Sequence, residues 1–232
     1  MPGRPRGFAA FARLLRGDHG QRVALAPADA TPLANLPLIA LDIETTGLDP
    51  QLDRMLSLAA LPLRGPHPDG EDLEFLVQPG VPIPPASTAV HGIDDAAVAA
   101  APPYPAHHAA VVERLHGRVA LGHTIGFDLA VIAAEARRHR LHLPATASLC
   151  LAELAAAVLP ENTAVDLDQL AHRFDVAIEG RHTARGDAVA AAAIWVRLLP
   201  HLLDRGIHTF GDARRVTAEI RALLSLKRRS RF

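Results

Sequence analysis

The sequence predicts an α/β domain in which helices cover a mixed β-sheet. Short, largely apolar runs come first along the chain and are separated by turn-forming residues, which is typical of a meander of strands. Segments with helical periodicity follow, and one more apolar run of strand length lies among them. Strands first, and then helices interleaved with a strand, favour a mixed sheet with helices packed against it.

Four apolar runs have the length of strands: residues 38–43, 54–63, 72–77 and 118–122. The first is almost wholly apolar, which fits a strand that is buried on both faces. Glycine and proline in residues 64–70 predict a turn. Residues 79–105 are rich in proline, so we expect this segment to be largely irregular.

Helical segments are predicted in six places: residues 106–116, 125–138, 149–158, 166–174, 184–199 and 211–226. In the second of these, Ile125, Leu129 and Ile132 fall on one helical face. Pro200 has no backbone N–H and is predicted to interrupt the fifth helix.

The chain of 232 residues is long enough to bury one sizeable core. We expect an N-terminal arm with a short helix (residues 1–36), a main domain (residues 37–204), and a C-terminal helix with a basic tail (residues 205–232). The tail, Lys227 to Arg231, could hold a phosphate backbone. A solvated helix end that complements the helix dipole is the commoner explanation.

The composition excludes several classes of protein. A net charge of −1 gives no overall attraction to nucleic acid or to an anionic membrane, so any nucleic-acid contact must come from a local patch or a bound metal. No apolar run approaches the ~20 residues of a membrane span, so no membrane partner is expected. The single cysteine, Cys150, excludes an internal disulfide and fits the cytoplasm.

Two acids end the first predicted strand. Side chains alternate along a strand, so Asp42 and Glu44 point to the same face. Placing two like charges side by side at the end of an apolar strand is costly unless a cation or hydrogen bonds compensate. The alternative is a strand that simply ends in solvent at this point.

Two more acids lie where helices are predicted to begin. Asp128 falls near a helix N-terminus, where the helix dipole alone could explain it. Asp187 opens the long helix and follows His182 by five residues. On one continuous helix their side chains would point ~140° apart, so a shared site requires His182 to lie on the preceding loop.

Three segments, in this order, resemble the three motifs of the DEDD superfamily of 3′→5′ exonucleases in its histidine-bearing version: residues 42–47, 122–128 and 182–187. Residues 90–93 and 166–170 also match the branch that includes the proofreading epsilon subunit of bacterial DNA polymerase III. The resemblance covers about residues 37–200. It implies a ribonuclease H-like fold with a mixed five-stranded sheet, three antiparallel strands plus parallel strands, and assigns an exonuclease domain to residues 37–204.

The resemblance also implies a mechanism. Two Mg²⁺ (or Mn²⁺) ions would be held by the carboxylates of Asp42, Glu44, Asp128 and Asp187, and the ions would offset the mutual repulsion of these acids. His182 would be the general base that activates the attacking water. The product would be a nucleoside 5′-monophosphate released from a nucleic-acid 3′ end.

By the same resemblance, Thr45 and Thr46 would receive the terminal 3′-hydroxyl, and His91 would contact the nucleotide near the scissile phosphate. For His91, a loop histidine on the surface is the alternative. His123 and Phe127 flank the second motif as further substrate-binding candidates, although packing explains Phe127 at least as well.

The sequence departs from the family pattern at Thr124, where asparagine is usual, and at Ser148, where aspartate is common. We expect both to affect the fit of the substrate. Single-stranded or frayed DNA 3′ ends are the favoured substrate, and an RNA-trimming enzyme of the ribonuclease T or oligoribonuclease kind is the alternative. A catalytically silent nucleic-acid-binding relative is a third possibility, and a polymerase partnership is left open.

Overall fold

A computed structural model describes residues 26–159 and 165–229, without the side chains of residues 224–229. Its strands are β1 (Pro37–Thr45), β2 (Met55–Arg64), β3 (His67–Pro68), β4 (Leu73–Leu76), β5 (Val119–Gly122) and β6 (Ser148–Cys150). Its helices are η1 (Leu33–Asn35), α2 (Pro85–His91), α3 (Asp95–Val98), α4 (Tyr104–Leu115), α5 (Gly126–Arg138), α6 (Leu151–Val158), α7 (Leu167–Arg173), α8 (Ala184–Asp204) and α9 (Phe210–Arg229).

The strands form one mixed sheet in the order β3-β2-β1-β5-β6, with β4 paired to β2. Strand β2 is antiparallel to β1, β3 and β4, whereas β5 is parallel to both β1 and β6. The predicted mixed α/β architecture with antiparallel and parallel strands is therefore confirmed. Within the described residues the sheet has six strands, one more than predicted.

Two very short strands lie where the sequence predicted something else. Strand β3 falls inside the predicted turn, and β6 takes the first residues of the predicted helix at 149–158. Three residues that lead directly into a helix carry too little periodicity to reveal a strand. Only the pairing with β5 makes Ser148–Cys150 a strand.

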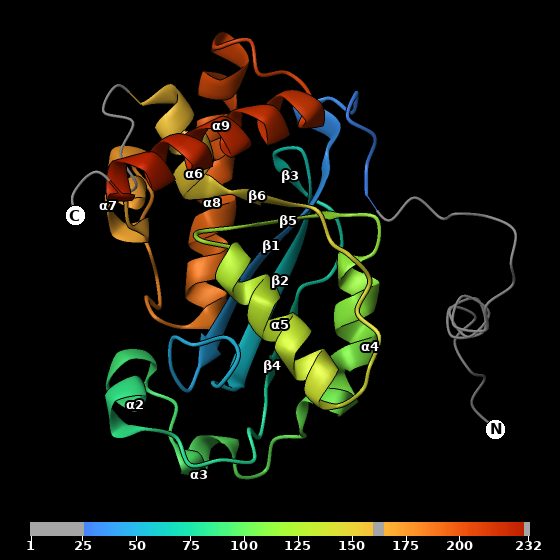
Figure 1. The fold of residues 1–232 in the computed structure, drawn as a ribbon, viewed down its shortest axis with the longest axis vertical. Coiled ribbons are helices and arrows are strands. Elements are labelled where there is room, and N and C mark those ends of the chain that lie inside the picture. The colour runs from blue at the N-terminus through green and yellow to red at the C-terminus, as the bar shows by residue number, and fades with distance from the viewer. Residues whose placement is uncertain (1–25, 160–164, 230–232) are drawn as a thin grey trace, which may run out of the picture.

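Helices cover both faces of the sheet. Leu38 and Ala40 of β1 pack into a core with residues of α6, α7, α8 and α9, whereas Ile39 and Leu41 pack on the opposite face with residues of α4 and α5. Figure 1 shows α5 crossing in front of β1 and β2. The alternation that was predicted for this strand thus separates two cores.

The flanking segments share the first of these cores. Pro32 forms an isolated bridge with Thr209, and Leu36 and Phe210 are buried in the same cluster as α8. The boundaries near residues 36 and 204 remain predictions. The short helix expected in the N-terminal arm lies outside the described residues, as do the side chains of the basic tail.

Two predictions about proline were wrong. The segment 79–105 contains α2 and α3, because Pro85 occupies a first-turn position where a missing N–H costs nothing, and Asp94 caps α3. Pro200 does not interrupt α8, which continues to Asp204. The buried side chains of Leu199 and Leu202 on either side of the proline keep this turn packed on the core.

Among the described residues, only α8 is long and apolar enough to cross a membrane by those two criteria. Its Ile194, Trp195 and Leu198 are fully buried in the core, and the Trp195 indole N–H donates to the Gly65 carbonyl at 2.9 Å. Packing against the sheet therefore accounts for its apolar composition.

Candidate active site

Three carboxylates from two elements converge at one end of the sheet. Asp42 and Glu44 lie on the face of β1 that packs toward α8, and Asp187 lies in the first turn of α8. One carboxylate oxygen from each residue lies within 4.8 Å of the others. Acids that are 145 residues apart in sequence thus form one cluster, as the three-motif pattern predicted.

Asp128, in the first turn of α5, belongs electrostatically to the same cluster. Burial and then the charge of Asp128 raise the pKa of Asp42 well above its usual range. Burial is also the main reason why the pKa values of Asp128 and Glu44 rise to about 7. The helix dipole lowers the pKa of a carboxyl at a helix N-terminus, so the dipole alone does not explain the raised pKa of Asp128.

The cluster fits a divalent cation. All its donors are carboxylate oxygens, the ligand type that Mg²⁺ and Mn²⁺ prefer. Asp187 Oδ1 is buried and has no hydrogen-bond partner among the described residues. A buried carboxylate oxygen without a partner costs free energy that a bound cation would offset.

His182 lies on the loop before α8, as its spacing from Asp187 required. Thr183 is the N-cap of α8, and its side-chain oxygen accepts a hydrogen bond from the Gly186 N–H at 3.0 Å. Helix α8 therefore begins after His182, whose backbone has a positive φ of 62°. The exposed imidazole precedes the buried Asp187 carboxylate on the same tight turn.

Gly186 is required for this turn. A Cβ at Gly186 would lie 2.0 Å from the Gly180 carbonyl oxygen and 2.5 Å from that of Glu179. Only glycine lets the first turn of α8 pack this closely against the loop that carries His182.

Arg181, which was not predicted to be a site residue, binds two carboxylates in this loop. Its Nη1 donates to Asp187 Oδ2, and its Nε donates to Asp168 Oδ1 and Oδ2 at 3.0 and 3.1 Å. The same Nη1 lies 3.1 Å from His182 Nδ1. Its position directly before the third motif was the signal that the sequence offered.

His91 is not the surface histidine that the alternative required, because it is buried at the end of α2. Its Nδ1 accepts a hydrogen bond from the Ile93 N–H at 3.1 Å, so Nε2 carries the proton. Burial is the main cause that lowers the pKa of His91, and the nearby His182 lowers it as well. The Thr45 carbonyl raises this pKa, but by less. Nε2 makes no hydrogen bond to any described residue, which leaves this donor for a ligand.

The threonine hydroxyls that were expected to receive a 3′-hydroxyl are engaged within the protein. Thr45 Oγ1 donates to the Gly47 carbonyl at 2.6 Å. Thr46 Oγ1 donates to Asp53 at 3.0 Å, and Ser87 Oγ of α2 donates to the Thr46 carbonyl at 2.7 Å. These bonds shape the loop after β1, and a direct contact with substrate remains a prediction.

His123 and Phe127 have local roles. His123 Nε2 hydrogen-bonds the Val165 carbonyl at 2.8 Å, which joins the loop after β5 to the start of α7. The half-buried Phe127 ring packs against the core cluster under α4 and α5. A role in substrate binding stays a prediction for both.

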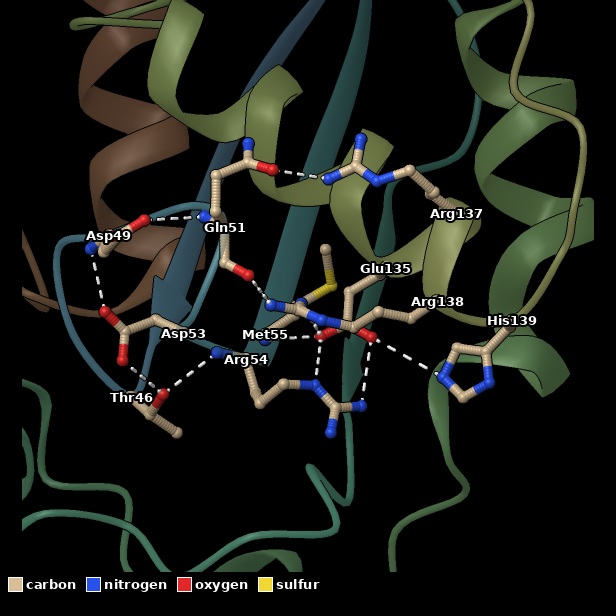
Figure 2. Close-up of polar contacts among 10 residues, drawn as sticks. All are labelled: Thr46, Asp49, Gln51, Asp53, Arg54, Met55, Glu135, Arg137, Arg138 and His139. Carbon is tan, nitrogen blue, oxygen red and sulfur yellow. Dashed lines mark hydrogen bonds and ion pairs between the residues drawn. The ribbon is translucent and has the colours of Figure 1, made fainter.

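Glu135 of α5 anchors the segment between β1 and β2, as Figure 2 shows. Its buried carboxylate accepts hydrogen bonds from Arg54 Nε and Nη2 at 2.7 and 3.1 Å. The Met55 N–H and Arg138 Nη1 donate to the same carboxylate at 3.3 and 3.2 Å. Glu135 was not predicted as a site residue, although its spacing of seven from Asp128 places both on one stripe of α5.

The exposed end of the same segment is also tied to α5 (Figure 2). Arg137 Nη2 and Arg138 Nη2 donate to the side-chain and backbone oxygens of Gln51, both at 2.6 Å. Asp49 Oδ1 accepts from the Gln51 N–H at 2.8 Å. The loop that follows the Asp42–Glu44 strand is thereby held against the helix that carries Asp128.

Comparisons with known proteins agree with this geometry. The family model described as Exonuclease, RNase T, matches residues 39–195. A DNA polymerase III subunit epsilon-like protein of Rhodobacter capsulatus is 42% identical over 192 residues, which are 78% of this chain and 26% of that protein. The DNA polymerase III subunit epsilon of Aquifex aeolicus is 27% identical over 164 residues, 71% of this chain and 81% of that protein.

Among solved structures, E. coli exonuclease I in complex with a dT13 oligonucleotide is similar, with a TM-score of 0.63 and 21% sequence identity. The match covers 73% of this chain and 43% of that chain. At this identity the likeness concerns the fold. The chain spans about a quarter of the length of the R. capsulatus relative.

Proposed function

Because the chain belongs to the RNase T exonuclease family, we propose that it is a metal-dependent 3′→5′ exonuclease that releases nucleoside 5′-monophosphates from nucleic-acid ends. The observation that supports this most directly is the cluster of Asp42, Glu44 and Asp187, with carboxylate oxygens within 4.8 Å of one another. A partly buried cluster of like charges is costly without a cation.

We infer that Asp42, Glu44, Asp128 and Asp187 hold two divalent ions, Mg²⁺ or Mn²⁺. Bound there, such ions polarise the phosphate and stabilise the charge that develops on the attacking and leaving oxygens. The carboxylates would hold the ions, and the ions would bind the phosphate at the reacting end of the strand. Burial raises the pKa values of Glu44 and Asp128 to about 7, so cation binding must displace protons from these two carboxyls below about pH 7.

We assign the general base to His182. Its ring is exposed on a loop that begins the same turn as Asp187, so water and substrate can reach it. A neutral imidazole near physiological pH can accept the proton of the attacking water. The second histidine, His91, carries its proton on Nε2 and suits a donor to a phosphate oxygen better than a base.

Single-stranded DNA is the substrate that we favour. Exonuclease I has the same fold, and its solved complexes contain dT13 and dA16 oligonucleotides. The alternative is an RNA-trimming enzyme, since the family model carries the name RNase T. The two differ in whether the pocket for the terminal sugar accepts a 2′-hydroxyl. A cytoplasmic location remains a prediction, and no polymerase partner is proposed.

The test uses matched DNA and RNA oligomers of one sequence, labelled at the 5′ end or at the 3′ end, with Mg²⁺, Mn²⁺ or EDTA. Stepwise shortening of the 5′-labelled strand and release of a labelled mononucleotide from the 3′-labelled strand would support the proposal. We expect EDTA to abolish both signals, and DNA to be cut faster than RNA.

Two variants separate the assigned roles. His182→Ala should lower turnover by about 10²–10⁴-fold, the usual contribution of a general base, while metal binding is retained. His142→Ala, which removes an exposed histidine on the loop after α5, serves as the control. Wild-type turnover in His182→Ala would refute the assigned base. No cleavage of any 3′ end by the wild-type protein would favour the catalytically silent relative.

A further inference from the structure

Arg181 lies at the point where the acid cluster and the assigned base meet. Its Nη1 forms an ion pair with Asp187 Oδ2 and lies 3.1 Å from His182 Nδ1. One guanidinium therefore contacts both a proposed metal ligand and the assigned base.

The contact with His182 fixes the tautomer of the imidazole. An arginine guanidinium only donates hydrogen bonds, so His182 Nδ1 must be the acceptor and Nε2 must carry the proton. The lone pair on Nδ1 is then engaged, and Nε2 has none to offer. In this arrangement neither ring nitrogen of His182 can accept a proton from water.

Arg181 also pairs with Asp168, and this pair would keep the guanidinium near the site after it leaves Asp187. Its Nε donates to both oxygens of Asp168, which is 61% exposed, whereas Asp187 is 8% exposed. The guanidinium can thus leave the buried Asp187 while the exposed Asp168 still holds it.

We propose that Arg181 is a built-in counter-cation that occupies the acid cluster, competes with divalent metal for Asp187, and holds His182 in a form that cannot act as a base. Metal binding would displace the guanidinium from Asp187, and the loss of this contact would free His182 Nδ1. Loading of the metal and activation of the base would be coupled through one side chain. This inference rests on the metal site of the proposed function.

If Arg181 instead supported a metal ligand, its removal would change the metal affinity in the opposite direction. A group that only supports a metal ligand from behind strengthens metal binding, and its removal weakens the affinity about 10–100-fold. A competitor weakens metal binding, so its removal raises the affinity. The sign of the change therefore separates the two roles.

The experiment measures Mn²⁺ binding by isothermal titration calorimetry in the full chain, with wild type, Arg181→Gln and Arg185→Gln. Arg185 is the matched control, because it is four residues away and pairs with Asp72 and Glu74 instead of the acid cluster. We expect Arg181→Gln to bind Mn²⁺ at least about tenfold more tightly than wild type, and Arg185→Gln to stay within about twofold. Circular dichroism confirms that each variant is folded.

A second measurement reads the tautomer of His182. In protein with ¹⁵N-labelled histidine, the metal-free wild type should show the His182 tautomer with the proton on Nε2. In Arg181→Gln, or after saturation of the wild type with Mg²⁺, the Nδ1 resonance should move toward that of an imidazole whose Nδ1 lone pair accepts no hydrogen bond. An unchanged Nδ1 resonance in both cases would contradict the proposed link between Arg181 and the base.

The outcomes distinguish this inference from the proposed function. If the wild type binds Mn²⁺ but Arg181→Gln binds it equally or more weakly, the competitor role is refuted and the metal site stands. If the wild type and Arg181→Gln both fail to bind Mn²⁺, the proposed metal site falls and this inference falls with it.

Discussion

Arg54 donates two hydrogen bonds to the fully buried carboxylate of Glu135, and this pair joins the segment after β1 to α5. Removal of Glu135 would leave the partly buried Arg54 guanidinium without its main partner. We expect Glu135→Ala to lower the free energy of unfolding by about 3–5 kcal/mol, measured by urea denaturation. Asp29→Asn, in the exposed pair with Arg214, should change it by less than about 1 kcal/mol.

A double variant tests whether the unpaired Arg54 charge causes this loss of stability. Replacing both partners by apolar residues removes the unpaired Arg54 charge, so Arg54→Met/Glu135→Met should be more stable than Glu135→Met alone. Equal losses in these two variants would mean that the unpaired Arg54 charge does not set the cost.

Removal of one proposed ligand should separate stability from activity. In Asp42→Asn, the remaining acids repel less, so the metal-free protein should melt at a higher temperature than wild type. Turnover should fall by more than about 100-fold. Even the loss of a residue that only hydrogen-bonds to a metal ligand lowers activity about 10–100-fold. Differential scanning calorimetry in EDTA measures the melting temperature, and a mononucleotide-release assay measures the turnover. Asp204→Asn, an exposed acid at the end of α8, should leave both unchanged.

The metal-free protein should lose stability as the pH rises toward neutrality. Burial raises the pKa values of Glu44 and Asp128 to about 7, so the folded protein keeps protons that the unfolded chain releases near pH 4. The unfolded state then binds fewer protons than the native state, and stability falls between about pH 4 and about pH 7. Melting temperatures in EDTA across this range should decline, and Mg²⁺ should restore stability at the upper end.

Substitutions identify which carboxyl causes the fall of the melting temperature with pH. Glu44→Gln should flatten the decline, whereas Glu71→Gln, at an exposed acid far along the chain, should not. A melting temperature that stays constant or rises between about pH 5.5 and 7 in EDTA would contradict the assignment.

Gly186→Ala should disturb the loop that carries His182. The added methyl group would collide with the Gly180 carbonyl, so the loop or the first turn of α8 must move. We expect a loss of about 1–3 kcal/mol in the free energy of unfolding and a drop in turnover of about 100-fold from the displaced base. Gly126→Ala, where nothing lies within 4 Å of the new Cβ, should be neutral or stabilising and should retain activity.

Thr124→Asn should stabilise the protein. Thr124 has a φ of 59°, a left-handed conformation that is strained for a β-branched residue and much better tolerated by asparagine. We expect a gain of about 1 kcal/mol in the free energy of unfolding. The same substitution at Thr31, which does not have a positive φ, should give no gain. A loss at Thr124 would mean that its hydroxyl contact with His123 outweighs the strain.

The sequence by itself determined the class of the fold and the residues of the acid cluster. Alternation along β1 fixed which side chains of Leu38 to Glu44 share a face, and the spacing of five before Asp187 required His182 to lie outside the helix. Both features depend on local backbone geometry, which a linear pattern records. Local order also set the start of α7, where Asp166 and Gln169 form a capping box.

Only the tertiary structure decided what surrounds those acids. The pairing of Glu135 with Arg54 and the burial of His91 arise from contacts between distant segments. Strand β6 and the continuation of α8 through Pro200 depend on packing that overrides local preference. The position of Arg181 between Asp187 and Asp168 depends on how the loop before α8 is folded, because a charge in a sequence does not reveal which opposite charge it will meet in space.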